Sequence, residues 1–399
     1  MISLEAAIET LLGEINPITR TRLVSLERAV GNISARSVHA SIDMPPFDRS
    51  PLDGYALRSD DSAGASRDCP VKLKVIAEIP AGSVWGGTAA NGEAVRIMTG
   101  GMLPKGTDCV VRQEDTDDGE HEVKIYSPVK RTENICVKGE DVEKGTEILA
   151  RDTLISYAHL GVLASAGHSR VLIKDRIRAA ILSTGDELSL PGEHLEPGRI
   201  YNSNLFMLAG RMEQLGTDVT SLHIAEDNAE EVERIIDREI DGVDILFTTG
   251  GVSVGRRDIM HNVVTRLAAK KLFWRVALKP GTPVLAAACR DKPLLCLSGN
   301  PFAALTNFEL LGRPALYRLS GDERLKHVRA SGIMENGFSK PSPQRRFIRA
   351  IYNNGLVKIP NSSHSPGSLM SMIGCNCLID VPEGNSGLKP GDRAEVLML

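Results

Sequence analysis

The stretch "FTTGGVSVGRRDIMHN", residues 247–262, decides the fold of this chain. An apolar run ends in two threonines, two glycines follow, and a helical pattern resumes after Asp258. Glycines let backbone N–H groups approach an oxyanion closely, and the N-terminus of the following helix favours negative charge. The stretch therefore predicts a strand, a phosphate-holding loop and a helix, in that order.

Runs of the same two kinds alternate on both sides of this stretch. We expect strands at residues 178–184, 218–224, 243–249, 271–278, 283–288 and 293–298. We expect helices at residues 202–216, 227–240, 258–270 and 301–317. Strands that alternate with helices of this length predict a parallel sheet that is covered on both faces.

The flanking segments follow other patterns. Short alternating runs predict a small all-β domain, at residues 71–79, 93–98, 108–113 and 122–126. Short runs after residue 328 predict a small barrel, at residues 345–352, 356–360, 377–382 and 394–399. Apolar residues have helical spacing at residues 3–15 and 152–167, and residues 21–40 read as helical or mixed. The prolines of residues 43–57 indicate extended or turn geometry.

Composition excludes several classes of protein. With 399 residues and 42% hydrophobic content, the chain has material for two to four globular domains. A net charge of −4 argues against bulk nucleic-acid binding. Seven cysteines without a C-x-x-C pair indicate neither a disulfide framework nor a zinc ribbon. No signal peptide and no long apolar stretch is visible, so we expect a cytoplasmic protein that does not enter the membrane.

Three of the predicted strands end in loops that suit an anionic ligand. In a parallel sheet the carboxyl ends of the strands meet at one edge, where ligands bind. A tight strand-to-helix turn would explain any one loop alone, but three in register favour a binding site. The candidate ligand-binding residues of these loops are Thr184, Gly185, Asp186, Gly250, Gly251, Ser253, Ser298, Gly299 and Asn300.

Carboxylates accompany these loops, and a hard cation would reconcile them with phosphate. Glu187 and Asp258 are the candidate Mg²⁺ ligands, and Asp227 follows another strand. Helix capping is the alternative role for Asp227 and Asp258, with Asn228 as a competing cap. Arg275 and Lys279 fall on one face of a strand and could neutralise an anion, or could form a solvated strand end.

Other catalytic classes lack their motifs. No G-x-x-x-x-G-K-[ST] loop and no G-x-G-x-x-G turn occurs, which argues against a P-loop NTPase and a dinucleotide oxidoreductase. The nine histidines show no zinc-binding spacing, and no G-x-S-x-G elbow is present.

Eight motifs, taken together and in order, resemble the molybdopterin molybdenumtransferase family, which includes MoeA and the E domain of gephyrin. They are "PPFDRSPLDGYAL", "RIMTGGMLPKGTDCVV", "NICVKGEDV", "STGDEL", "IYNSN", "TTGGVSVGRRD", "LKPGTPV" and "LSGNPFAAL". The resemblance covers essentially the whole chain. Each motif is weak alone, but eight in the same order are highly specific.

The resemblance implies a multidomain α/β protein with four parts. An elongated, mainly helical part would comprise residues 1–44 and 142–175, with a β domain, residues 45–141, inserted into it. An α/β domain that binds molybdopterin and nucleotide would span residues 176–322, and a β-barrel residues 323–399. The family forms homodimers, with the site between the α/β domain of one subunit and the inserted β domain of the other.

The implied reaction belongs to molybdenum cofactor biosynthesis. Molybdate is inserted into adenylylated molybdopterin, and AMP is released in a Mg²⁺-dependent step. The upstream adenylyltransferase and downstream molybdoenzymes are the implied partner proteins. Carried over by motif, the implied catalytic positions are Asp53, Thr99, Asp141, Glu187, Asp227 and Lys279. As a hypothesis, Glu187 and Asp258 act at the metal or phosphate, and Asp53 and Asp141 at the molybdate.

The chain departs from the family pattern at positions that carry charge. Cys136 replaces a common Arg, Arg256 a common acidic residue, Arg275 and Thr282 common lysines, and Ser298 a Pro. These changes leave open the choice between molybdate and tungstate, and two other functions. One is a non-catalytic paralogue that carries or scaffolds the cofactor, and the other is a molybdopterin adenylyltransferase, which would resemble residues 176–322 alone.

Overall fold

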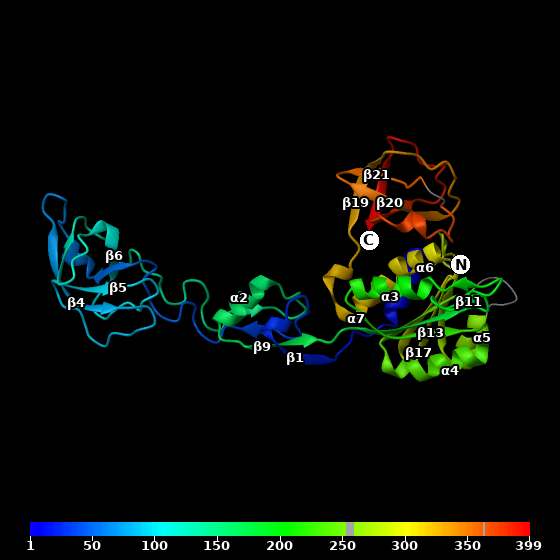
Figure 1. Cartoon of the computed structure of the whole chain (residues 1–399), viewed down its shortest axis with the longest axis horizontal. Helices are drawn as coiled ribbons and strands as arrows, with labels where there is room; N and C mark the ends of the chain where they lie inside the picture. The colour runs from blue at the N-terminus through cyan, green and yellow to red at the C-terminus, as the bar shows by residue number, and fades with distance from the viewer. Residues whose placement is uncertain (253–258, 362–363) are drawn as a thin grey trace. The chain divides into compact units, whose positions relative to one another are not determined.

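The computed structural model describes residues 1–252, 259–361 and 364–399, and the chain divides into two compact units (Figure 1). The first unit comprises Met1–Arg22 and Lys174–Leu399, and the second Leu23–Ile173. The second unit is therefore inserted into the sequence of the first. The chain passes between them within β1 (Thr21–Ser25) and β9 (Arg170–Lys174), which form a two-stranded sheet.

The first unit is built on a six-stranded sheet. Its strand order is β13 (Asp218–Ala225), β10 (Arg178–Thr184), β14 (Ile245–Thr249), β18 (Lys292–Leu297), β17 (Leu285–Cys289) and β15 (Lys270–Trp274). The first four strands are parallel, as predicted, but β17 runs opposite to them, and β15 pairs antiparallel with β17 at the edge. Only Arg290 and Asp291, both with positive φ, join β17 to β18, and so short a turn permits only a hairpin.

Helices cover both faces of this sheet (Figure 1). One face packs on α4 (Ala229–Glu239) and α5 (Ile259–Arg266). The other packs on α1 (Leu4–Gly13), α3 (Asn204–Gln214), α6 (Pro301–Asn307) and α7 (Arg313–Ser320), with a π-helical turn, Phe308–Gly312, before α7. Helix α1 was expected with residues 142–175, but Leu4 and Leu11 are buried in the core of this unit.

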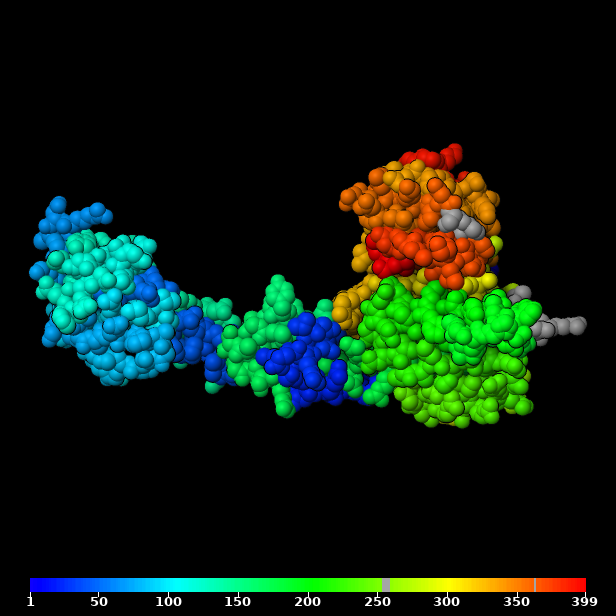
Figure 2. Space-filling model, viewed as in Figure 1, coloured from blue at the N-terminus to red at the C-terminus, as the bar shows by residue number. Residues whose placement is uncertain are grey.

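The C-terminal strands close into the predicted barrel. The ring runs β20 (Arg345–Asn353), β21 (Leu356–Lys358), β19 (Arg329–Met334), β23 (Arg393–Met398) and β22 (Cys377–Val381), and β22 pairs back with β20. A short strand, β16 (Leu278–Lys279), adds to β20 at the edge. Phe347, Leu378 and Leu397 join the core of the α/β sheet, so the barrel sits directly on that domain (Figure 2).

The second unit contains a five-stranded sheet. Its order is β6 (Cys109–Arg112), β3 (Gly54–Leu57), β5 (Glu93–Ile97), β4 (Val71–Ile79) and β7 (Glu122–Ile125). Four of these strands follow the predicted runs, whereas β3 lies in the segment expected as extended or turn. Residues 21–40 hold β1, a 3₁₀ turn and β2 (Val38–His39), and β2 pairs with β8 (Glu147–Leu149). The predicted helix at 152–167 is α2 (Tyr157–Ser165).

The helices of the described parts of the chain are all too short or too polar to span a bilayer.

A buried ion pair ties the first unit together at the start of β10. Arg20 donates two hydrogen bonds of 2.7 Å to the carboxylate of Asp244, which also accepts the Arg178 N–H at 2.8 Å. The Asp244 side chain is only 2% exposed. Burial would raise the pKa of this carboxyl group, but the hydrogen bonds from Arg20 and from the Arg178 amide hold it below its ordinary value.

Replacing Asp244 by asparagine should lower the free energy of unfolding by about 2 kcal/mol at pH 7, because the two-bond ion pair with Arg20 is lost. The effect is smaller than for a fully buried pair, since the Arg20 side chain is 36% exposed. Because the folded pKa is depressed, this stability is present above about pH 4 and is lost as pH falls below that. Urea unfolding at pH 7 and pH 3 would measure both effects.

The matched control is Asp218→Asn, which removes the exposed pair that Asp218 makes with Arg176 at 3.3 Å. It should change the unfolding free energy by less than about 0.5 kcal/mol. Equal losses of unfolding free energy for the two variants would mean that the Asp244–Arg20 ion pair contributes no more stability than a surface ion pair.

Candidate functional site

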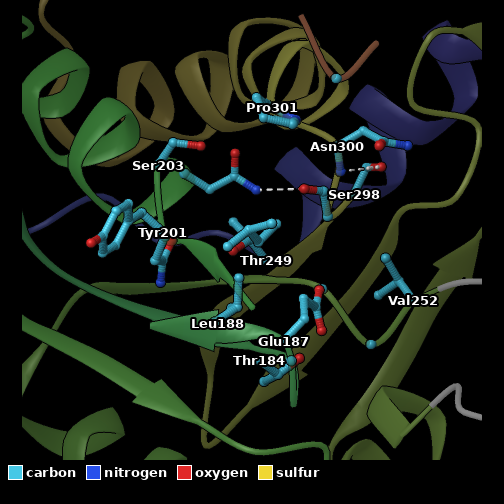
Figure 3. A pocket seen from close by; sticks show the side chains of 18 of the residues that line it. Thr184, Glu187, Leu188, Tyr201, Ser203, Thr249, Val252, Ser298, Asn300 and Pro301 are labelled. Carbon is cyan, nitrogen blue, oxygen red and sulfur yellow. Dashed lines mark hydrogen bonds between the residues drawn. The ribbon is translucent and has the colours of Figure 1, made fainter. Parts of the chain in front are cut away.

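A cavity of about 750 Å³ opens at the carboxyl ends of β10, β14 and β18 (Figure 3). The three loops predicted to meet at this edge of the sheet do meet there. Of the candidate ligand-binding residues, the cavity is lined by Thr184, Gly185, Gly250, Gly251, Ser298, Gly299 and Asn300. Figure 3 shows Thr184 and Glu187 at one side of this space and Asn300 and Pro301 at the other.

Glycine is required where the loops touch. Gly250 has φ +90°, and a Cβ built on it would overlap the carbonyl oxygen of Thr184. A Cβ on Gly299 would lie 3.6 Å from the Cα of Gly250, so the β14 and β18 loops are in direct contact. The Gly250 N–H donates to the carbonyl oxygen of Leu297 at 3.3 Å. Bare backbone therefore forms the floor of the cavity, as the glycine pattern indicated.

Among the described residues, two carboxylates line this cavity, those of Glu187 and Asp227. Glu187 is exposed and folds over Gly185, whose Cβ would lie 2.7 Å from Glu187 Oε2. Asp186 is not a lining residue, because its Oδ1 accepts the Asp227 N–H at 3.0 Å and fixes the start of the next loop. Two carboxylates beside a floor of bare backbone fit Mg²⁺, which takes one or two protein carboxylates and completes its shell with substrate and water oxygens.

The capping alternative for Asp227 is wrong. Helix α4 is capped by Asn228, whose side chain accepts the N–H groups of Glu230 and Glu231 at 2.9 and 3.2 Å. Asp227 itself lines the cavity.

The loop between β10 and α3 adds cavity residues that were not assigned from sequence. It contains β11 (Leu188–Ser189) and β12 (Ile200–Tyr201) and ends in Asn202 and Ser203, and Asn204 begins α3. Asn204 donates to the carbonyl oxygen of Gly299 at 2.7 Å, which joins the start of α3 to the loop after β18. The quoted motif "IYNSN" was the available signal for these residues.

A second cavity, of about 760 Å³, adjoins the first and shares Pro283, Ser298 and Asn300 with it. Its basic side chains among the described residues include Lys279, which was predicted, and Lys340 and Arg346, which were not. The two missed cations come from the barrel, and no local pattern relates that region to the β18 loop.

Two further residues at this second cavity add no positive charge to it. His364 also lines it, and burial lowers the pKa of its imidazole, so the ring is neutral at neutral pH. Thr282, which stands where the family commonly has lysine, donates its hydroxyl to the carbonyl oxygen of Leu278. That position therefore adds no charge to the cavity.

Other predicted residues lie elsewhere. Arg275 does not line either cavity, and its guanidinium lies 4.8 Å from the centre of the Trp274 ring. Its φ of +66° ends β15 at Trp274, so the strand predicted to continue to residue 278 is wrong. Ser253, Arg256 and Asp258 lie outside the described residues, so the pairing of Glu187 with Asp258 stays a prediction.

Asp53, Thr99 and Asp141 belong to the second unit, and all three are exposed. Asp53 Oδ1 accepts the amide N–H of Thr99 at 2.6 Å and its hydroxyl at 2.7 Å. The Thr99 amide lowers the pKa of Asp53, which keeps this carboxylate ionised. Within this unit, two hydrogen bonds therefore join the sequence-distant "LDGYAL" and "TGG" motifs. The roles of these residues stay predictions.

Fold and site together define a multidomain protein with a glycine-floored cavity at the carboxyl edge of an α/β sheet. Comparisons with known proteins narrow this class. Residues 2–167 match the family described as the MoeA N-terminal region (domains I and II). Residues 180–318 match a probable molybdopterin binding domain, and residues 331–399 the MoeA C-terminal region (domain IV).

Whole-chain relatives agree with these matches. A molybdopterin molybdenumtransferase of Staphylococcus aureus is 36% identical over 379 residues, covering 94% of this chain and 90% of its own. One of Staphylococcus epidermidis is 34% identical over 400 residues, covering 100% and 95%. A crystal structure of a molybdopterin biosynthesis MoeA protein from Pyrococcus horikoshii superimposes with a TM-score of 0.89 at 30% identity, covering 100% of this chain and 99% of that one. The chain belongs to the molybdopterin molybdenumtransferase (MoeA) family of enzymes.

Proposed function

We propose that this chain is an enzyme of molybdenum cofactor biosynthesis that inserts molybdate into adenylylated molybdopterin and releases AMP. The observation that carries the proposal is the pair of adjoining cavities, one floored by glycine backbone with carboxylates and the other lined by cations. A ligand with a pyrophosphate suits the first cavity, and a small oxyanion suits the second.

In the first cavity, the loop backbone and helix N-termini would hold the phosphates, as they do in other anion sites. Glu187 and Asp227 would hold Mg²⁺, which when bound offsets the charge on the phosphoanhydride oxygens. The chain's own contribution is to fix this group in place for cleavage, since phosphoryl transfer needs mainly positioning and electrostatics.

In the second cavity, Lys279, Lys340 and Arg346 would attract molybdate. The second cavity shares Ser298 and Asn300 with the first, which supports a short route for this oxyanion to the dithiolene sulfurs of a ligand bound in the first cavity.

The same proposal has the enzyme act in the cytoplasm as a homodimer, with Asp53 and Asp141 of a second copy completing the site. Ile200 and Tyr201 at the first cavity are 56% and 44% exposed, and apolar side chains left open at a site favour a further contact. Transfer of adenylylated molybdopterin from the adenylyltransferase, and of the product to molybdoenzymes, follows from the reaction proposed.

The test is AMP release by the purified protein given adenylylated molybdopterin and Mg²⁺, with molybdate, with tungstate or with neither. We expect release that requires the oxyanion and stops when EDTA removes Mg²⁺. Tight binding of the substrate without AMP release would instead support the carrier function, for which the uncharged Thr282 is the motivating observation. ATP consumption with molybdopterin would support the adenylyltransferase.

A further inference from the structure

A buried asparagine at the end of helix α6 bridges two loops that line the cavities. Asn307 is fully buried, and it is not among the residues that line either cavity. A buried amide is costly unless its polar atoms are paired, because it gives up its hydrogen bonds to water. The partners of this amide therefore show which parts of the structure the residue holds.

Both halves of the Asn307 amide bind the backbone of cavity-lining loops. Its Nδ2 donates to the carbonyl oxygen of Gly281 at 2.8 Å, and its Oδ1 accepts the N–H of Ser298 at 3.4 Å. These partners fix the orientation of the amide, because a carbonyl oxygen needs the donor and an N–H needs the acceptor. Gly281 lines the basic cavity, and Ser298 lines both cavities.

The contact between Asn307 and Gly281 is close. Gly281 has φ +97°, and a Cβ built on it would lie 2.4 Å from Asn307 Nδ2. The turn that carries Gly281 is also closed at its base, where the Val276 N–H donates to the carbonyl oxygen of Thr282 at 3.1 Å. Lys279, a cation of the basic cavity, belongs to this turn. Asn307 therefore ties the turn that carries Lys279 to the loop after β18.

The neighbouring residue shows that a buried polar side chain in α6 can be paired without such a bridge. Thr306 is equally buried, and its hydroxyl donates to the carbonyl oxygen of Phe302 in the same helix at 2.7 Å. Asn307 instead bonds to backbone that lies 26 and 9 positions away in the sequence. Its bonds therefore relate two cavity walls to each other.

We propose that Asn307 is a positioning residue for molybdate insertion, which holds the Lys279 turn at a fixed distance from Ser298. The proposal rests on the function proposed above. Lys279 and Gly281 line the basic cavity and Ser298 lines both, so the bridge fixes a cation of one cavity relative to the wall that it shares with the other. Because a misplacement of about 1 Å can lower a rate by about 100-fold, this bridge bears on kcat.

The test compares Asn307→Leu with Thr306→Val. Leucine has nearly the shape of asparagine but makes neither hydrogen bond, and valine removes the hydroxyl of the neighbouring threonine. Both variants should lose stability. Only Asn307→Leu should lower kcat per folded molecule by about 20-fold and raise the KM for molybdate by about fivefold. The KM for adenylylated molybdopterin should change by less than about twofold, because neither Lys279 nor Gly281 lines the first cavity.

Asn307→Ser keeps the test decisive if Asn307→Leu does not fold. A serine hydroxyl can bond to a carbonyl oxygen of its own helix, as that of Thr306 does, but it is too short to span both loops. This variant should fold and should lower kcat by about fivefold. Calorimetric binding of molybdate alone reports on the Lys279 turn without turnover, and both Asn307 variants should bind molybdate more weakly than Thr306→Val does.

The proposal is overturned if the Asn307 variants match Thr306→Val in kcat and in molybdate KM per folded molecule. It is also overturned if the KM values for molybdate and for adenylylated molybdopterin rise equally, since the bridge would then only stabilise the domain. Failure of the function itself is seen separately, as an unmodified protein that releases no AMP in response to molybdate.

Discussion

Glu187→Gln should lower molybdate-dependent AMP release by about 100-fold or more, because it removes a charge from the proposed Mg²⁺ site without changing the shape of the side chain. Glu187 is exposed to the cavity and lies over Gly185 at the end of β10. The loss should be in kcat, and the Mg²⁺ concentration that gives half-maximal rate should rise. Steady-state assays over a Mg²⁺ titration would measure both.

The matched control is Glu193→Gln, a glutamate of the same loop whose carboxylate accepts the Leu190 N–H and does not line the cavity. Its glutamine can keep that bond, so AMP release should change by less than about twofold. A direct measurement of Mn²⁺ binding would separate metal affinity from rate. If Glu187→Gln matched the control in rate and metal affinity, the carboxylate of Glu187 would have no part in holding the metal.

Gly250→Ala should lower the free energy of unfolding and the free energy of substrate binding by about 3 kcal/mol or more in total. The positive φ of Gly250 disfavours any side chain, and the added Cβ would overlap the carbonyl oxygen of Thr184. To remove this overlap, the β14 loop must move away from the β10 loop, and that movement opens the floor of the cavity. Thermal unfolding together with calorimetric binding of AMP would show how the loss divides.

Gly210→Ala is the control for this prediction. Gly210 lies within α3, where a Cβ would meet no atom within 4 Å. Alanine is preferred over glycine in a helix, so this variant should gain about 0.5–1 kcal/mol of stability and bind ligand normally. Equal behaviour of the two alanine variants would show that the loops do not need a bare backbone at Gly250.

The α/β domain could be predicted closely because its signals are local. The run of β10, the glycines after β14 and the apolar spacing of α4 each specify their own element. The reversed direction of β17 was missed, because it depends on the two-residue turn at Arg290 and Asp291, whose positive φ values no sequence pattern shows. Strand β3 was missed because the prolines near it dominate the pattern.

The part of the site that depends on local sequence signals could also be predicted. Loops that follow strands of one sheet must meet, so Thr184, Gly250 and Ser298 could be grouped from sequence alone. Lys340, Arg346 and the loop at residues 364–369 could not, because their place beside the sheet is set by the packing of the barrel on the α/β core. Only the tertiary structure shows that relation.

The insertion of the second unit has a consequence for synthesis on the ribosome. Helix α1 buries Leu4 and Leu11 in the same core as Phe308 and Leu316, about three hundred residues further along the chain. At ordinary elongation rates those partners emerge tens of seconds after α1 does. Residues 23–173 are complete long before then and can fold in the meantime. The nascent chain must therefore carry an unpartnered apolar helix throughout that interval, which makes its N-terminal segment a natural binding site for chaperones during translation.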